Sequence, residues 1–163
     1  MQMTGQRLRI LQVAATPVGG DWFCDQVTGL QRLGNTVCAV LPGEGPLADR
    51  LRAAQIRVEI IPFSGRQVRQ LPRIATAEAR LLRLVRAFRP DVIHAHLIKA
   101  MLSCRLAACA YPSALRVSQV PGTVHLRTPV ARWLDRATLR RDDVVVGSCR
   151  AIADSYRAMG ARS

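Results

Sequence analysis

Six short apolar segments alternate with segments of helical pattern along the chain, and this alternation restricts the fold more than any other feature. Each apolar segment is rich in Val, Ile or Leu and is followed by turn residues, as a buried strand is. Strands separated by helices pair in parallel, because each helix carries the chain back across the sheet. We therefore expect an α/β fold with a Rossmann-like, doubly wound parallel sheet and helices on both faces. The expected strands cover residues 8–15, 36–41, 57–62, 91–96, 115–120 and 143–146.

The helical segments begin and end at residues that suit helix termini. Asp21 is the expected N-cap of the first helix, which Gly34 ends, and Pro46 suits the first turn of the second. Ser148 is the expected N-cap of the last helix. The expected helices cover residues 22–33, 47–54, 72–88, 97–111, 128–140 and 150–159. No internal repeat or linker interrupts this order, which indicates one domain over residues 1–163.

The segment Arg89–His96 (RPDVIHAH) links a helix to a strand and delivers two histidines to the end of that strand. Pro90 disfavours helix at the residue before it, so the preceding helix should stop there. His94 and His96 are two residues apart on the following strand and therefore share one face. Ligands of open α/β sheets bind outside the carboxyl ends of the strands. We therefore expect these histidines in the ligand crevice.

Two glycines occupy the turn after the first strand. Gly19 and Gly20 would let a ligand approach the backbone closely, and the N-terminus of the next helix favours an anion there. Their spacing is neither G-x-G-x-x-G nor a P-loop, which disfavours a classical dinucleotide or nucleoside triphosphate site. Asp21 has two possible roles, as the helix cap or as a hydrogen-bond acceptor for a sugar hydroxyl.

His125 stands alone after the fifth strand. It could be a general base, a hydrogen-bond donor or a structural group, and no neighbouring carboxylate is identified that would orient it. His94 and His96 could form a metal pair, but no third ligand is obvious, so no metal site is expected. No G-x-S-x-G motif supports a Ser-His-Asp site. The residues alone thus predict a crevice lined by glycines and histidines.

The net charge of +13 is concentrated in two stretches. Residues 66–89 hold seven arginines against one glutamate, and residues 127–141 hold five arginines against one aspartate. An anionic partner is plausible, such as a phosphate, an acidic glycan or an anionic leaflet, and the alternative is a solvated helix face. Aromatic residues make up only 4% of the chain, which disfavours nucleic acid. The candidates for an anionic surface are Arg66, Arg69, Arg73 and Arg80.

The five cysteines are scattered and include no C-x-x-C. This pattern is typical of reduced, mostly buried thiols in a cytoplasmic protein. No apolar run reaches the length of about 18 residues that a membrane-spanning helix needs. The last residues look like the start of a connection to another segment.

The chain resembles the N-terminal domain of the retaining glycosyltransferases of the GT-B fold, in the family 4 group. Several segments carry the resemblance in the order of the family. They are the turn Val18–Gly20 with the following LQRLGNTV, the helix PLADRL at 46–51, the signature RPDVIHAH at 89–96, the Thr-x-His at 123–125 and the strand DVVVGS at 143–148.

The resemblance implies that this domain holds the acceptor, while a C-terminal domain, absent from this chain, holds the sugar nucleotide. Gly19 and Gly20 would line the cleft near the donor phosphates. His125 would lie beside the transferred sugar, and His94 or His96 would support that site. No cofactor is implied besides the sugar nucleotide as substrate. The arginines would suit a phosphorylated or lipid-linked acceptor at the inner face of the membrane.

The chain also departs from the family pattern. Asp21 and Trp22 stand where the family usually has a small residue and then a glutamate, and Leu126 replaces a common glycine or aspartate. The paired glutamates of the family belong to the absent domain, so we expect this chain alone to be inactive. One interpretation is the acceptor half of a glycosyltransferase, truncated or working with a separate donor-binding subunit. The alternative is a non-catalytic binding module, and a lone half could form a homodimer.

Overall fold

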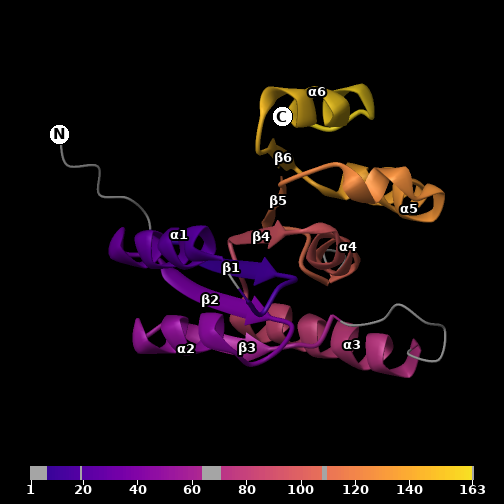
Figure 1. Ribbon diagram of the computed structural model, residues 1–163. Coiled ribbons are helices and arrows are strands. Elements are labelled where there is room, and N and C mark those ends of the chain that lie inside the picture. Colours follow the sequence, from indigo (N-terminus) through magenta and orange to yellow (C-terminus); the bar gives the residue numbers. More distant parts are fainter. Residues whose placement is uncertain (1–6, 19, 64–70, 108–109, 163) are drawn as a thin grey trace.

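The computed structural model describes residues 7–18, 20–63, 71–107 and 110–162, and within them a single parallel sheet organises the molecule (Figure 1). Six strands form the sheet in the order β3-β2-β1-β4-β5-β6, and every neighbouring pair is parallel. The predicted fold class is therefore confirmed. The strands are β1 (Arg9–Ala14), β2 (Thr36–Leu41), β3 (Arg57–Ile60), β4 (Val92–His96), β5 (Leu115–Val120) and β6 (Val144–Gly147).

Helices cover both faces of this sheet. On one face, α1 and α2 pack against β1 and β2 through a core that includes Phe23, Leu47 and Leu41. On the other face, α3, α4 and α6 contribute to a larger core around Val13 and Ile93. The helices are α1 (Asp21–Arg32), α2 (Pro46–Ala53), α3 (Leu71–Phe88), α4 (Ile98–Ala107), α5 (Pro129–Thr138) and α6 (Arg150–Ala158), with short 3-10 turns η3 (Val124–Arg127) and η4 (Leu139–Arg141).

The winding direction reverses between β1 and β4. The chain builds outward from β1 to β3 and then crosses back through α3 to form β4 on the other side of β1. Such a reversal opens a crevice at the carboxyl ends of the two central strands. In the register of this pair, Gln12 lies opposite His94 and Ala14 lies opposite His96. The fold therefore places both histidines beside β1.

Some of the predicted boundaries and caps are wrong. The third strand ends at Ile60 rather than at residue 62, and the helix expected over 128–140 is split into α5 and the 3-10 turn η4. Cys149, not Ser148, is the N-cap of α6. The Ser148 hydroxyl instead donates to the carbonyl oxygen of Pro121 at 3.1 Å, because it lies beside the turn after β5.

The cysteines are free, as predicted, wherever they are described. Cys24, Cys38 and Cys104 are buried and Cys149 is exposed, while the fifth cysteine lies outside the described residues. Among the described residues, no helix combines the length and apolar character that crossing a bilayer requires.

Gly147 at the end of β6 gives a first testable prediction. A Cβ atom at this position would lie 2.6 Å from the backbone nitrogen of Ala153 in α6, closer than packed atoms can approach. We expect Gly147→Ala to lower the free energy of unfolding by about 1–3 kcal/mol, because strand and helix must separate. Urea unfolding followed by circular dichroism measures this loss.

Gly29 is the matched control. It lies inside α1, and a Cβ there meets nothing within 4 Å. Gly29→Ala should leave the protein as stable or raise its stability by up to about 1 kcal/mol, through helix propensity. Equal stability of the two variants would contradict the close packing of α6 on β6.

Candidate functional site

Two adjoining hollows open at the carboxyl ends of the central strands, and we call them together the crevice. The first, of about 400 Å³, is lined by the turn after β1, the start of α1 and the ends of β4 and β5. The second, of about 510 Å³, is lined by the start of α4 and by the segment from β5 to α5. Leu97 and Pro121 line both hollows. The crevice therefore lies where the topology predicts a ligand site.

Gly20 lines the first hollow and caps α1. Its φ of 80° is a left-handed conformation that side chains rarely adopt, and its carbonyl oxygen accepts hydrogen bonds from the backbone of Phe23 and Cys24. The predicted cap at Asp21 is therefore wrong, because the helix already includes Asp21 as its first residue. Gly19 lies outside the described residues.

Asp21 is turned to the surface. Its carboxylate forms an ion pair with Arg50 of α2, and its side chain is 82% exposed. It is not among the described residues that line the first hollow. The structure therefore separates Asp21 from the other predicted residues of the crevice and brings its neighbour Trp22 into the crevice instead.

His94 and His96 are joined by one buried glutamine. The Gln12 side-chain amide donates to Nδ1 of His94 at 3.3 Å, and its oxygen accepts from Nε2 of His96 at 2.7 Å. The two imidazole rings lie 4.1 Å apart, which confirms that the histidines share a face. Only His96 lines the first hollow, where its ring lies 5.1 Å from the indole of Trp22.

Both histidines are uncharged at neutral pH. Burial lowers the pKa of His94 to about 4, against the opposing effect of a hydrogen bond with Gln119. Burial and the neighbouring His94 lower the pKa of His96 to about 3. The pair therefore forms a neutral inner wall of the crevice and does not act as an acid or base near pH 7.

His125 lies in the turn η3 and lines the second hollow. Its Nε2 lies 3.1 Å from a carboxylate oxygen of Asp135 and 3.0 Å from the hydroxyl of Tyr156. The Tyr156 hydroxyl also donates to that carboxylate oxygen, at 2.5 Å. The carboxylate can only accept, so Nε2 carries the proton and Nδ1 keeps a lone pair. A histidine held in this way can accept a hydrogen bond or a proton from a ligand hydroxyl.

The carboxylate that orients His125 is itself anchored by Arg105 of α4. Arg105 bonds Asp135 at 2.6 Å and Asp142 at 2.6 Å, and all three side chains are at least 97% buried. Burial alone would raise the pKa of Asp135, but its hydrogen bonds with His125, Tyr156 and Arg105 hold that pKa below its usual value. Asp135 is therefore ionised at neutral pH, and its carboxylate accepts the hydrogen bond that orients His125.

These supporting residues were not identified from the sequence. Asp135 follows Trp133 and Leu134 in an arginine-rich helix, where an aspartate suggests a solvated position. Arg105 stands among small and apolar residues, and this setting was the one available signal, because an arginine in a buried helix needs acidic partners. Those partners are 30 and 37 residues away in sequence, which no local pattern reveals.

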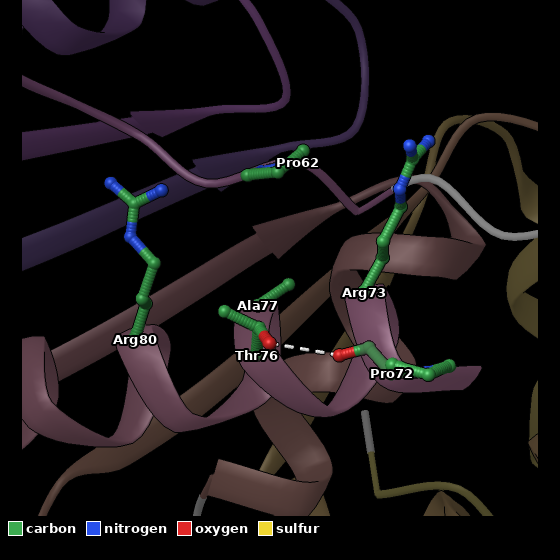
Figure 2. Close-up of a pocket in the computed structure, with 6 residues that line it drawn as sticks. All are labelled: Pro62, Pro72, Arg73, Thr76, Ala77 and Arg80. Carbon is green, nitrogen blue, oxygen red and sulfur yellow. Dashed lines mark hydrogen bonds between the residues drawn. The ribbon is translucent and has the colours of Figure 1, made fainter. Parts of the chain in front are cut away.

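The predicted basic surface is described only in part. Figure 2 shows Arg73 and Arg80 separated along α3, on either side of Pro62, where they line a pocket of about 450 Å³. Arg66 and Arg69 lie outside the described residues. Within the described part of the chain, no cluster of three or more His, Cys, Asp or Glu side chains could hold a metal ion.

Comparisons with known proteins bear on the family and the fold. The family model of the glycosyl transferase 4-like domain matches residues 22–163. A search of curated protein sequences finds no significant match. The solved structure of Alr3699/HepE from Anabaena in complex with UDP-glucose is similar, with a TM-score of 0.70 and 16% identity, over 96% of this chain and 42% of that chain.

Two further solved structures share the fold. MurG from Acinetobacter baumannii has a TM-score of 0.64 and 16% identity, over 89% of this chain and 42% of that chain. A putative UDP-N-acetylglucosamine 2-epimerase from Listeria monocytogenes has a TM-score of 0.71 and 16% identity, over 97% of this chain and 43% of that chain. The chain thus spans less than half the length of these structures.

The buried histidines predict how stability depends on pH. Folded His94 and His96 stay neutral down to about pH 4 and 3, whereas in the unfolded chain they take up protons below their ordinary pKa of 6.5. Their contribution to stability is present above pH 6.5 and is lost as the pH falls toward the folded values. For each of the two histidines, we expect the free energy of unfolding to fall by up to about 1.4 kcal/mol for every unit by which the pH is lowered below 6.5.

Urea unfolding measured at several values between pH 6.5 and 5 tests this expectation. The double variant His94→Asn with His96→Asn should show a flatter dependence in that interval. An unchanged slope would mean that these side chains are accessible to protons in the folded state.

Asp135 gives a second prediction for this site. Asp135→Asn removes a charge that Arg105 and His125 both contact, and it should lower the free energy of unfolding by about 3 kcal/mol, because Arg105 stays buried with one partner fewer. Asp154→Asn is the control, since Asp154 pairs with Arg157 at the exposed surface. The control should change stability by less than about 0.5 kcal/mol. Equal losses in denaturant unfolding would refute the structural role of Asp135.

Proposed function

Because the chain belongs to the glycosyl transferase 4-like family, we propose that it is the N-terminal, acceptor-side half of a retaining glycosyltransferase. The observation that carries this proposal is the position of His125. It lies at the crevice of the sheet, with its Nε2 fixed by Asp135 and Tyr156. In the proposed reaction, His125 lies beside the transferred sugar and positions it.

The proposed donor is a sugar linked to a nucleoside diphosphate. Two similar structures are described as complexes with UDP-glucose or with UDP, which supports a nucleotide of this kind. The turn at Gly20 and the N-terminus of α1 would lie near the donor phosphates, because unpaired backbone N–H groups at a helix start favour anions. The proposal needs no metal or cofactor besides the sugar nucleotide.

The proposed acceptor is a glycan, a lipid-linked sugar or a phosphorylated molecule. The first hollow offers the indole of Trp22 and the neutral wall of His96, a combination that suits a sugar ring with one apolar face. Arg73 and Arg80 would accommodate an acidic group farther along the surface. We propose that the enzyme acts in the cytoplasm, at the inner face of the membrane, where such an acceptor would be reached.

The proposed partner is a donor-binding half. The chain spans less than half of the similar structures, so the groups that hold the nucleotide lie elsewhere, in a continuation of this chain or in a separate subunit. This chain alone is expected to bind acceptor without transferring sugar. If the remaining half does not restore transfer, the alternative function as a non-catalytic binding module is favoured.

A transfer assay tests the proposed function. The chain is combined with its donor-binding half, and transfer of radiolabelled sugar from UDP-sugars to extracted lipids and glycans is measured. We expect His125→Ala to lower kcat/KM by about 100-fold or more, as the loss of a positioned polar group at a reacting centre does.

Arg83→Gln is the control for this assay, because Arg83 lies on the exposed outer side of α3, away from the crevice. It should retain full activity. Full activity of His125→Ala, or the same transfer by the isolated chain, would contradict the proposal.

A further inference from the structure

Helix α5 is turned with its apolar side outward. Its one fully buried residue is Asp135, whereas Val130 is 66% exposed, Trp133 is 67% exposed and Leu134 is 36% exposed. A surface helix normally buries its apolar stripe and exposes its charged residues. In α5 an ion pair holds the helix to the protein, while two residues of the apolar stripe, Val130 and Trp133, are left about two-thirds exposed.

The stripe faces away from the crevice. At about 100° per residue, Trp133 and Val130 point roughly 160° and 140° away from Asp135, which contacts His125. Figure 1 shows α5 at the margin of the molecule, well separated from α2 and α3. A domain that closed over His125 would therefore approach the other side of this helix.

Arginines lie on one flank of the stripe and at both of its ends. At about 100° per residue, Arg136 lies about 60° and Arg132 about 100° from Trp133 around the helix, on the same flank. Arg127 precedes the stripe and Arg140 follows it, and all four arginines are exposed. None of their guanidinium groups has an ion-pair partner among the described residues, and the one acid between residues 124 and 141 is the buried Asp135. The surface that covers this helix must therefore be apolar in its centre and anionic at its edge.

We propose that α5 docks this protein on an anionic lipid bilayer, with Val130, Trp133 and Leu134 inserted among the acyl chains and the arginines among the headgroups. Tryptophan favours this boundary because its ring is apolar and its N–H is polar. A second copy of the chain fits less well, because a two-fold contact through α5 would bring the same arginines together. Docking here leaves His125 about one helix diameter, roughly 10 Å, from the lipid.

The inference rests on the proposed function in one respect: docking through α5 would bring the crevice close to an acceptor held in the membrane. Docking itself is independent of sugar transfer. Binding to vesicles can therefore fail while sugar transfer to a soluble acceptor succeeds. Conversely, the protein can bind vesicles while sugar transfer fails. This difference separates failure of the docking inference from failure of the proposed function.

Vesicle co-sedimentation of the purified protein tests the proposal, with phosphatidylcholine alone and with phosphatidylcholine mixed with phosphatidylglycerol. We expect binding that requires the anionic lipid. The pair Arg132→Gln with Arg136→Gln should weaken binding by about 25-fold, or roughly fivefold for each arginine near the surface. The charge-matched control pair, Arg83→Gln with Arg86→Gln on α3, should weaken it less than twofold. If the two double variants weaken binding equally, the proposal would be overturned, and the whole positive charge of the protein, rather than α5, would account for vesicle binding.

A second arm tests insertion of the apolar stripe. In a Trp22→Phe background, Trp133 is the remaining tryptophan, and its fluorescence should shift to the blue with anionic vesicles and be quenched by brominated acyl chains. Trp133→Ser should lower binding at least tenfold, whereas Leu33→Ser, at the exposed C-cap of α1, should not change it. Unquenched fluorescence, or Trp133→Ser that binds normally, would rule out insertion. If Trp133→Ser keeps its binding to vesicles but loses its binding to a donor-binding half, α5 would be assigned to a protein interface instead.

Discussion

The buried contact of Arg105 with two aspartates is the interaction on which the outer half of this molecule depends. It joins α4 to α5 through Asp135, and α4 to the end of η4, just before β6, through Asp142. Three charged groups removed from water are expensive to bury, and only close pairing offsets that loss. Burial, helped by the charge of Asp135, raises the pKa of Asp142 even though Arg105 and Ser118 hydrogen-bond this carboxylate, which shows how strongly this interior disfavours a charged group. The network therefore requires one arrangement of the three segments.

This constraint fixes the geometry of the crevice. Asp135 contacts Arg105 with one carboxylate oxygen and contacts both His125 and Tyr156 with the other. The turn η3 buries no residue completely, so few packing contacts would hold the imidazole in place. The ion pair thus does for His125 what burial does for His94 and His96, which are held by hydrogen bonds with the buried Gln12 and, for His96, by the ring of Phe23. One wall of the crevice is held by charges and the other by burial.

The sequence was sufficient for the fold because each element has a local signal. The strand over residues 115–120 was predicted with its observed bounds, and RPDVIHAH placed two histidines on one face of a strand beside β1. The site was less predictable, because its contacts join distant segments. Gln12 and His96 are 84 residues apart, and His125 meets Tyr156 across 31 residues. The misplaced cap at Asp21 has a local cause, since a left-handed glycine can begin a helix without any side-chain hydrogen bond.

Some arginines of this chain pair with acids inside or on the protein, and others among the described residues have exposed side chains without such a pair. The net charge alone does not separate these two groups, so it could not decide between an anionic partner and a solvated helix face. Arg105 is structural and fully paired, and Arg50, Arg52 and Arg57 meet acids at the surface. Those pairs neutralise Asp21, Glu44 and Glu59 in the α1–β3 half, whereas the acid nearest to α5 is paired in the interior. Positive charge is therefore left over on α5 as well as on α3, and α5 combines it with exposed apolar residues. Asp135 lies on the buried side of α5, where it orients His125. The same burial keeps its charge away from the exposed arginines of the helix, which it would otherwise have balanced.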